Sequence, residues 1–332
     1  MIKFSVIIPV YNRPDEIVEL LDSLTMQSIK SQMEVIVVED GSTATCEHEI
    51  KHFANQLNIT YLYQENKGPG LARNNGAAHA SGEFLLFFDS DCVIPSDYFD
   101  KIIRHLQQED LDCFGGPDKE HTFFSPIQKA ISYSMTSILT TGGIRGGKHK
   151  LDKFYPRSFN LGVKRELFNK IGGFSDMRFG EDLDFSLNAH KYGMKIGLVT
   201  NTFVYHKRRT NFKSFFKQVF SSGTARIELS RRHKGSLKPV HLLPSLFVIS
   251  IPIMLILGIL VHPFFSLPLI VLPVIIFMNA WMRMKSFRVA VIGTYASLVQ
   301  TVGYGTGFLS ALWVSQIRKK GRFEAFKKNF YN

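Results

Sequence analysis

The chain has 332 residues, of which 45% are hydrophobic and 20% are charged, and its formal net charge is +12. This length allows one large domain or two ordinary ones. The three cysteines, Cys46, Cys92 and Cys113, do not have the spacing of metal ligands, and their odd number does not allow all of them to pair in disulfides. They argue against a cysteine metal site or a disulfide framework, and they fit a reducing compartment.

The positive charge is concentrated in two segments. Residues 204–240 contain ten Lys and Arg against one acid, and residues 315–332 contain six against one, whereas residues 1–203 contain 21 against 26 acids. Between the basic segments, residues 241–314 contain no Asp or Glu. Basic charge beside apolar sequence indicates contact with an anionic membrane surface on the cytoplasmic side, and it argues against nucleic acid as the partner.

Short apolar runs alternate with helical patterns in the first 90 residues. The runs predict strands at residues 4–8, 34–38, 59–63 and 84–88. The helical patterns cover residues 15–28, 46–57 and 69–80. Polar residues follow the first run at once, so we interpret it as a strand and not as a signal peptide. This alternation predicts an α/β fold with a mostly parallel sheet, in which ligands bind at the carboxyl ends of the strands.

Two carboxylates follow the fourth predicted strand, in the sequence Asp89-Ser90-Asp91. At the end of a buried strand they would repel each other unless a cation neutralised them. Carboxylate oxygens suit Mg²⁺ or Mn²⁺, and such an ion would stabilise a diphosphate leaving group. The alternative interpretation is an ordinary acidic turn.

A second acidic segment, Glu39-Asp40-Gly41-Ser42, follows the apolar run Val35–Val38. A carboxylate there can accept hydrogen bonds from a nucleobase edge or a ribose, and Gly41 allows close approach of the backbone. The alternative interpretation is a turn with an Asp-Gly signal.

The pattern is less regular between residues 110 and 200. A Gly- and Lys-rich stretch from Thr141 to Lys153 is typical of a loop. Residues 210–232 then form a basic pattern with several phenylalanines, which predicts a helix lying on a membrane surface.

Three apolar stretches follow, at residues 242–261, 264–282 and 289–314. The first two are joined by His262-Pro263, which predicts a tight helical hairpin. A full crossing by the third stretch would place the basic residues 318–328 outside, against the positive-inside tendency. Because the third stretch is rich in glycine, we leave both a crossing and a re-entrant or interfacial hairpin open, and we favour the hairpin.

Several of these segments occur together in a characteristic order. They are Val6–Asn12, Val38–Ser42, Gly68–Gly76, Ala80–Glu83, Phe88–Asp91, Gly172–Phe174 and Gly180–Asp184. This succession resembles the family 2 glycosyltransferases, which are inverting enzymes with a GT-A fold, a Rossmann-like mixed sheet. The resemblance covers about residues 1–210.

The resemblance implies roles for residues that bind the nucleotide-sugar donor. Asp40 would contact the nucleoside, and Pro9 and Tyr11 would line the pocket for the base. Arg73 and Asp89 would lie near the donor.

The resemblance also implies a metal site and a catalytic base. Asp89 and Asp91 match the D-x-D pair, with Asp91 as the direct ligand of Mn²⁺ or Mg²⁺, and His206 matches a late histidine that serves as a further ligand. Asp182 aligns with the base that takes the proton from the acceptor hydroxyl, and Glu181 is the second choice. The alternative for both acids is an ordinary first helical turn, and for His206 a surface position.

Two further sequence features refine the expected activity. The Q-x-x-R-W signature of processive synthases is absent from the sequence, which favours addition of a single sugar. The segment Gly303–Phe308 is similar to membrane-bound transferases that build bacterial exopolysaccharide repeats on a lipid carrier.

We therefore predict four segments: a GT-A domain at 1–210, a basic juxtamembrane segment at 211–240, membrane helices at 241–317 and a basic tail at 318–332. The protein would attach to the cytoplasmic membrane by several crossings or a hairpin, with its catalytic domain facing the cytoplasm. Its predicted function is transfer of a sugar from a nucleotide sugar to a hydroxyl of a lipid-linked or other glycan acceptor. The expected partners are these two substrates and membrane lipids, without nucleic acid.

Two alternatives remain. A polyprenyl-phosphate sugar synthase would use the lipid phosphate as acceptor and would not need a base, so Gly180–Asp182 argues against it. A non-catalytic membrane or nucleic-acid-binding protein could use the basic residues 204–240. The acidic N-terminal region argues against binding to nucleic acid.

Overall fold

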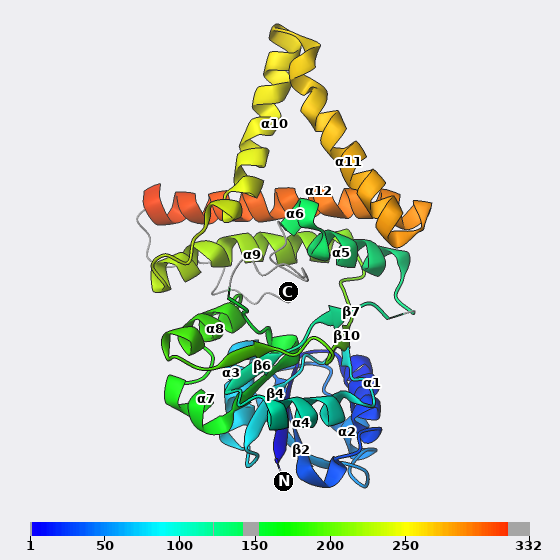
Figure 1. Cartoon of the computed structure of the whole chain (residues 1–332), viewed down its shortest axis with the longest axis vertical. Helices are drawn as coiled ribbons and strands as arrows, with labels where there is room; N and C mark the ends of the chain where they lie inside the picture. Colours follow the sequence, from blue (N-terminus) through cyan, green and yellow to red (C-terminus); the bar gives the residue numbers. More distant parts are fainter. Residues whose placement is uncertain (1, 122, 142–152, 318–332) are drawn as a thin grey trace. The chain divides into compact units, whose positions relative to one another are not determined.

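The computed structural model of the chain describes residues 2–121, 123–141 and 153–317 (Figure 1). The chain divides into two compact units. Unit 1 comprises Met1–His121 and Asp152–Lys207, and unit 2 comprises Thr122–Leu151 and Arg208–Asn332. Most of the predicted Gly- and Lys-rich loop, residues 142–152, and the predicted basic tail, residues 318–332, lie outside the described residues.

Within the described residues, unit 1 is built on a seven-stranded mixed sheet. In spatial order its strands are β3 (Asn58–Gln64), β2 (Met33–Asp40), β1 (Phe4–Val10), β4 (Phe84–Phe87), β8 (Leu161–Lys164), β6 (Cys113–Gly115) and β9 (Ile196–Leu198). β1 to β4 run parallel, and β8 is antiparallel to both of its neighbours. The predicted α/β fold class is confirmed, and all four predicted strands are present.

Helices pack on both faces of this sheet. One face packs against α1 (Pro14–Thr25), α2 (Glu47–Lys51) and α4 (Tyr98–Gln108), and the other against α3 (Pro69–Ala78), α7 (Arg165–Ile171) and α8 (Glu181–Lys191). The helix predicted at 46–57 is shorter than expected. After Lys51 the chain continues in turns, as in the hydrogen bond from Phe53 N to the Ile50 carbonyl oxygen (3.0 Å).

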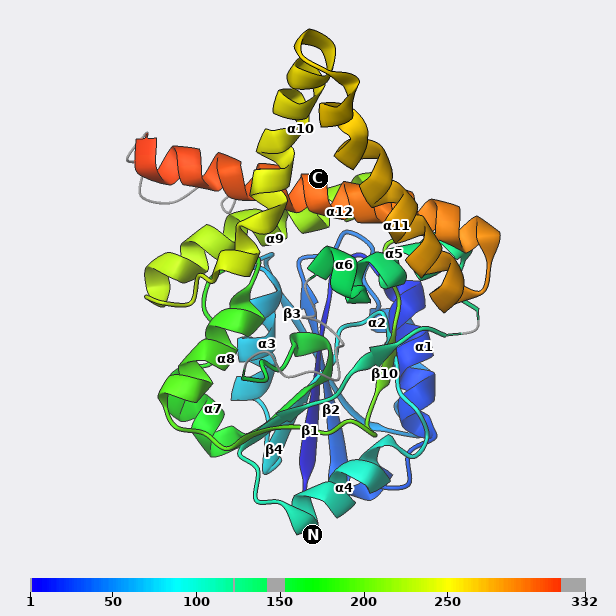
Figure 2. The same cartoon turned by 45° about the horizontal axis from the view of Figure 1, so that its top comes forward.

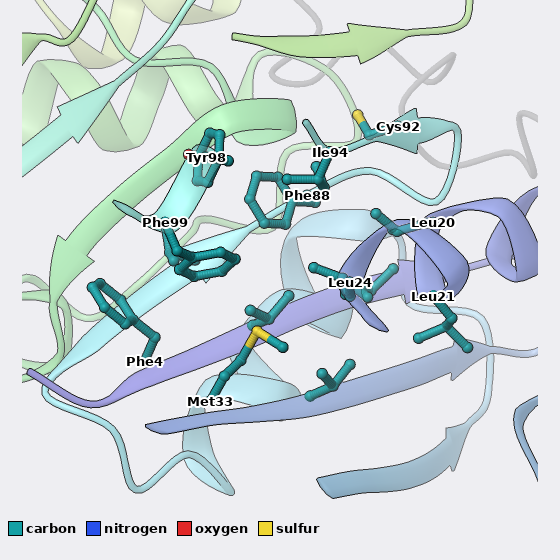
Figure 3. Packing of buried hydrophobic residues seen from close by; sticks show 14 of the residues in the cluster. Phe4, Leu20, Leu21, Leu24, Met33, Phe88, Cys92, Ile94, Tyr98 and Phe99 are labelled. Atoms are coloured by element: carbon teal, nitrogen blue, oxygen red, sulfur yellow. The ribbon is translucent and has the colours of Figure 1, made fainter. Parts of the chain in front are cut away.

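Aromatic side chains in the core fix the segments that carry polar residues. On one face, Phe88 packs edge-on against Tyr98, with ring centroids 5.5 Å apart (Figure 3). On the other face, Phe174 packs against Phe87 and Phe185 at 5.0 and 5.1 Å. These contacts hold the loop after β4 and the start of α8 to the same rigid sheet.

A small second sheet completes unit 1. It consists of β5 (Cys92–Val93), β10 (Val204–His206) and β7 (Asp118–Lys119). β10 pairs antiparallel with β5, with His206 opposite Cys92. The end of unit 1 is thereby brought to the loop after β4.

Unit 2 is helical. Its longer helices are α5 (Pro126–Thr136), α9 (Phe212–Arg232), α10 (Leu243–Leu260), α11 (Leu267–Met284) and α12 (Phe287–Leu312), and the short α6 (Ile138–Thr141) follows α5. Asn211 caps α9 by accepting a hydrogen bond from Ser214 N (2.8 Å), so the predicted basic helix is present. By length and composition, Leu243–Leu260 and Pro263–Met284 could each cross a membrane.

The hairpin that we favoured for the third apolar stretch is wrong. The stretch forms one continuous helix, α12. Its glycines serve close packing instead of a turn, because a Cβ added to Gly303 would meet Val219 at 2.5 Å and one added to Gly307 would meet the Phe220 carbonyl oxygen at 2.1 Å. A glycine-rich pattern therefore marked a helix–helix contact.

Candidate active site

The polar residues singled out in unit 1 follow the carboxyl ends of its parallel strands. Asn12 comes after β1, Asp40 ends β2, and Asp89 comes after β4. Neighbouring parallel strands end at the same edge of a sheet, so these segments lie together there.

Asp89, Asp91 and His206 form a cluster of possible metal ligands. His206 Nε2 lies 3.1 Å from Asp91 Oδ1 and 4.0 Å from Asp89 Oδ2. The imidazole stacks on the ring of Phe159, with centroids 4.7 Å apart, and its strand pairs with β5. Two carboxylates and an imidazole on a fixed backbone fit a divalent cation such as Mn²⁺ or Mg²⁺.

Cys92 lies within the same cluster but does not fit as a ligand. Its Sγ is close enough to Asp91 and His206 to be considered by distance. Burial, together with the negative charges of Asp91 and Asp89, raises the pKa of this thiol well above its usual value. Sulfur is moreover a soft ligand, whereas Mn²⁺ and Mg²⁺ prefer oxygen.

Two arginines neutralise the D-x-D carboxylates. Arg13 Nη1 lies 2.8 Å from Asp91 Oδ2, and Arg73 Nη2 lies 2.5 Å from Asp89 Oδ1. Arg73 is buried, and its Nη1 lies 3.0 Å from Glu181 Oε1. Burial lowers the pKa of the Arg73 guanidinium, but the charges of Asp89 and Glu181 outweigh this effect and raise it. Arg73 thus joins the loop after β4 to the start of α8 through a permanent positive charge.

Glu181 and Asp182 are the first two residues of α8, which follows Gly180 in a left-handed conformation (φ 80°). Both carboxylates are buried. Burial, with the nearby charge of Asp182, raises the pKa of Glu181 from 4.5 to about 7, although Arg73 opposes this shift. Glu181 is paired with Arg73, whereas Asp182 has a different partner.

Asp182 is held by an arginine and by the backbone. Arg157 Nε lies 2.7 Å from Asp182 Oδ2, and Leu183 N donates to Asp182 Oδ1 at 2.7 Å. The Arg157 side chain is 31% exposed, so this ion pair lies at the edge of the solvent. The carboxylate is thus held in one orientation beside a partly exposed arginine.

Asp40, at the end of β2, accepts hydrogen bonds from two backbone N–H groups and one side chain. Its Oδ1 accepts from Lys67 N (2.9 Å) and Gln64 Nε2 (2.8 Å), and its Oδ2 accepts from Gly68 N (2.9 Å). Gly41 has φ 74°, and an added Cβ would lie 2.5 Å from Asn66 N. Pro9 and Tyr11, at the end of β1, are partly exposed.

A buried network joins the ends of β1 and β2. Glu39, which is fully buried, accepts hydrogen bonds from Ser42 Oγ, Cys46 N and Tyr61 OH. Ser42 Oγ in turn accepts from Asn12 N at 2.7 Å. Burial and the charge of Glu39 raise the pKa values of Cys46 and Tyr61, which keeps both protonated.

Sequence reasoning missed Arg13 and Arg157. Arg13 follows Asn12 at the end of the first strand, so the rule that placed Asp40 and Asp89 at strand ends could have found it. Arg157 precedes a short strand and pairs with a residue 25 positions later, and no local signal in the sequence identified it.

Comparison with known proteins gives a consistent family. The model of Glycosyl transferase family 2 matches residues 5–172. The putative glycosyltransferase EpsH of Bacillus subtilis is 30% identical over 237 residues, which are 68% of this chain and 67% of EpsH. Glycosyltransferase AglE of Haloferax volcanii is 28% identical over 72% of this chain and 78% of AglE. Poly(ribitol-phosphate) beta-N-acetylglucosaminyltransferase TarS of Staphylococcus aureus is 43% identical over 104 residues, but these are 17% of TarS.

Solved structures share the fold. TarS 1–349 of S. aureus in complex with UDP-GlcNAc has a TM-score of 0.51 and 20% identity, covering 93% of this chain and 91% of that chain. Mannosyltransferase PcManGT from Pyrobaculum calidifontis in complex with GDP-Man and Mn²⁺ has a TM-score of 0.56 and 19% identity, covering 96% and 88%. Both are transferases with the GT-A fold.

Proposed function

The chain belongs to glycosyltransferase family 2, and from this membership we propose that it is a metal-dependent, inverting transferase attached to a membrane. It moves a sugar from a nucleoside-diphosphate sugar to a hydroxyl of a lipid-linked glycan in cell-surface polysaccharide synthesis. The observation that carries this proposal is Arg73, which contacts both Asp89 of the carboxylate–histidine cluster and Glu181, the neighbour of Asp182. Arg73 would thereby hold the site for the departing diphosphate, at Asp89, close to the base that deprotonates the acceptor, Asp182.

The donor is a nucleotide sugar. Asp40 lies at the end of β2, beside the partly exposed Pro9 and Tyr11, where a nucleoside can be bound. TarS and PcManGT, which share this fold, were solved with UDP-GlcNAc and GDP-Man, and this supports a nucleoside diphosphate as the carrier of the sugar.

Asp91 and His206 would hold a Mn²⁺ or Mg²⁺ ion together with Asp89. A bound cation supplies positive charge that stabilises the departing diphosphate. The Mn²⁺ in the PcManGT complex supports this assignment. Arg73, already on Asp89, adds a positive charge at the same end of the sheet.

Asp182 is the catalytic base. The acceptor oxygen forms a bond to the anomeric carbon while the bond from that carbon to the diphosphate oxygen breaks, and Asp182 takes the hydroxyl proton. Attack on the face opposite the leaving group inverts the configuration. Glu181 is the weaker candidate because its partner Arg73 is buried, whereas the partner of Asp182, Arg157, is partly exposed.

The acceptor is a lipid-linked glycan, and the protein attaches to the cytoplasmic membrane with its catalytic domain on the cytoplasmic side. The proposal rests on the two apolar helices α10 and α11 and on the basic residues that flank them. The corresponding segments are a transferase domain at 1–210, a juxtamembrane segment at 211–240, membrane-associated helices at 241–317 and a tail at 318–332.

The test is an assay of nucleoside diphosphate release by the full chain in mild detergent, with a panel of nucleotide sugars and with or without Mn²⁺ or Mg²⁺. We expect metal-dependent release from one donor. Asp91→Ala should abolish it, and Asp182→Asn should abolish transfer while donor binding persists. The exposed Asp22, changed to Asn, is the matched control and should retain activity. If no donor showed metal-dependent binding or release, the proposal would be wrong.

A further inference from the structure

The hairpin formed by α10 and α11 carries apolar side chains that no other described part of unit 2 covers. Along its two helices, the buried residues are Ser245, Ile276 and Ala280. Large apolar side chains point outward on both helices, such as Ile253 (50% exposed) and Ile270 (64% exposed). Residues 239–282 contain no charged residue. A surface of this kind is stable in lipid hydrocarbon and not in water.

The bases of the two helices contact different turns of α12, and the helices converge at their far ends (Figures 1 and 2). Ser245 Oγ of α10 donates to the Gly305 carbonyl oxygen at 3.4 Å, whereas Ala280 of α11 packs against Ala290. The 15 residues between these two points of α12 correspond to about 22 Å. Each helix has 18 residues and is therefore about 27 Å long. Because the two helices form the sides of a triangle whose base is the distance of about 22 Å along α12, the tip stands about 25 Å from α12. This height falls short of a hydrocarbon core of about 30 Å.

The tip of the hairpin has its backbone donors satisfied internally. Val261 N and His262 N both donate to the Leu257 carbonyl oxygen, at 2.9 and 3.1 Å. Phe264 N donates to His262 Nδ1 at 3.2 Å, and Phe265 N donates to the His262 carbonyl oxygen at 3.1 Å. Proline, at position 263, has no N–H to satisfy. Pairing of these donors lowers the cost of placing the turn in hydrocarbon, where an unpaired N–H group would cost several kcal/mol.

α12 is joined to a charged helix along its length. α9 and α12 run parallel, with Gly223 against the backbone of Tyr304 and Gly307 against that of Phe220. α9 carries Lys213, Lys217, Arg226, Glu228, Arg231 and Arg232. A crossing by α12 would draw these charges into the bilayer.

The ends of the hairpin and the outer side of α12 have the residues of a membrane interface. Basic residues lie at both ends of the hairpin: Lys238 precedes α10, Arg283 is in the last turn of α11, and Lys285 and Arg288 follow it. Exposed apolar side chains recur on one side of α12 at Phe287, Val291 and Tyr295, and Trp313 follows its end. Basic and aromatic side chains are favoured at the level of the lipid headgroups.

We propose that the α10–α11 hairpin is re-entrant. It enters the bilayer from the side of the transferase domain, its tip at His262–Phe265 ends within the hydrocarbon, and it returns to the same side. α12 lies flat with α9 in the headgroup layer and does not cross. The inference deepens the membrane attachment proposed above and depends on it.

The test is the reactivity of single introduced cysteines with a membrane-impermeant maleimide, in intact cells and in inverted vesicles that contain the full chain. Lys51→Cys marks the side of the transferase domain, because its side chain is 71% exposed. Phe264→Cys and Val261→Cys mark the tip, and Ser315→Cys marks the region after α12. The parent chain, whose three cysteines are buried, supplies the background.

We expect Ser315→Cys to react from the same side as Lys51→Cys. The tip cysteines should be protected from both sides and should react once detergent is added. Reaction of a tip cysteine from the side opposite Lys51→Cys would mean a hairpin that spans the membrane, and reaction from the same side would mean no insertion. Reaction of Ser315→Cys from the opposite side would mean that α12 crosses. Each of these outcomes overturns the inference, and diphosphate release measured on the same membranes tests the transferase proposal separately.

Discussion

The guanidinium of Arg13 lies 2.8 Å from Oδ2 of Asp91, the carboxylate to which we assign the metal ion. The other oxygen of Asp91 faces His206 Nε2 at 3.1 Å. Arg13 also pairs with Glu16 at 2.6 Å, so it keeps one ion pair if a cation takes Asp91. Arg13 is therefore a counter-ion of Asp91 that a bound metal ion would displace.

Arg13→Ala should strengthen Mn²⁺ binding in the absence of donor. A partly exposed ion pair contributes up to about 1 kcal/mol, so the dissociation constant should fall by about fivefold. The signal of free Mn²⁺ in electron paramagnetic resonance measures it, and Arg13→Lys, which keeps the charge, is the control. Weaker binding by Arg13→Ala would show that Arg13 supports the metal site instead of competing with the ion.

Glu181→Gln should change how the stability of the protein depends on pH. Burial raises the pKa of Glu181 in the folded chain from 4.5 to about 7. The protonated carboxyl therefore contributes stability that is complete below about pH 4.5 and is lost as the pH rises through 7. The variant lacks this loss, so its Tm relative to wild type should rise between pH 4.5 and 7 and then level off.

The size of this effect is about 3 kcal/mol, because the pKa rises from 4.5 to about 7 and one pKa unit corresponds to about 1.4 kcal/mol. Circular dichroism melts of the full chain measure it, with Glu166→Gln as a control at an exposed glutamate. A difference in Tm that stayed constant with pH would indicate that Arg73 keeps Glu181 ionised throughout.

Arg157→Ala should lower kcat and leave the KM for the donor unchanged. Arg157 forms an ion pair with Asp182, and in the proposed mechanism it would orient this base. Misplacement of a catalytic group by about 1 Å can cost about 10²-fold in rate. Arg157→Lys should restore part of the rate, since the contact uses a single nitrogen. Arg104→Ala, at an exposed arginine, is the control. An effect confined to the donor KM would place Arg157 at the donor instead.

The parallel strands and their carboxyl ends could be predicted from the sequence because their signals are local. The strand at 84–88 is a continuous apolar run, and its side chains are buried on both faces of the sheet. The short β5 and β10 could not be predicted, since strands of two or three residues exist through their pairing with each other. The histidine of the cluster was found through the family resemblance, and its position depends on that pairing.

The ion pairs of the site could not be predicted for a related reason. Arg13 and Asp91 are 78 residues apart, and Arg73 and Glu181 are 108 apart. No periodicity relates such positions, so only the folded sheet brings them together. The same applied to the glycines of α12, whose partner helix lies about 85 residues earlier. Without that helix, glycine in the sequence indicated a turn.

Gly307→Ala should destabilise unit 2 more than Gly293→Ala, although both lie on α12. A Cβ at Gly307 would lie 2.1 Å from the Phe220 carbonyl oxygen, whereas at Gly293 the nearest atom is Cδ1 of Tyr133 at 3.2 Å. Alanine favours a helix over glycine by about 1 kcal/mol at either position. Overpacking costs about 1–3 kcal/mol, so it should outweigh this gain at Gly307 but be offset in part at Gly293.

The two tryptophans of the chain, Trp281 and Trp313, both belong to unit 2, so their fluorescence reports the unfolding of this unit. Thermal melts of the full chain in detergent should give a lower midpoint for Gly307→Ala than for Gly293→Ala. The circular dichroism of the folded state should be unchanged, because both variants keep the helix. Equal midpoints would mean that α9 and α12 can move apart at no cost. A flat α12 would then need a cause other than its packing against a charged helix.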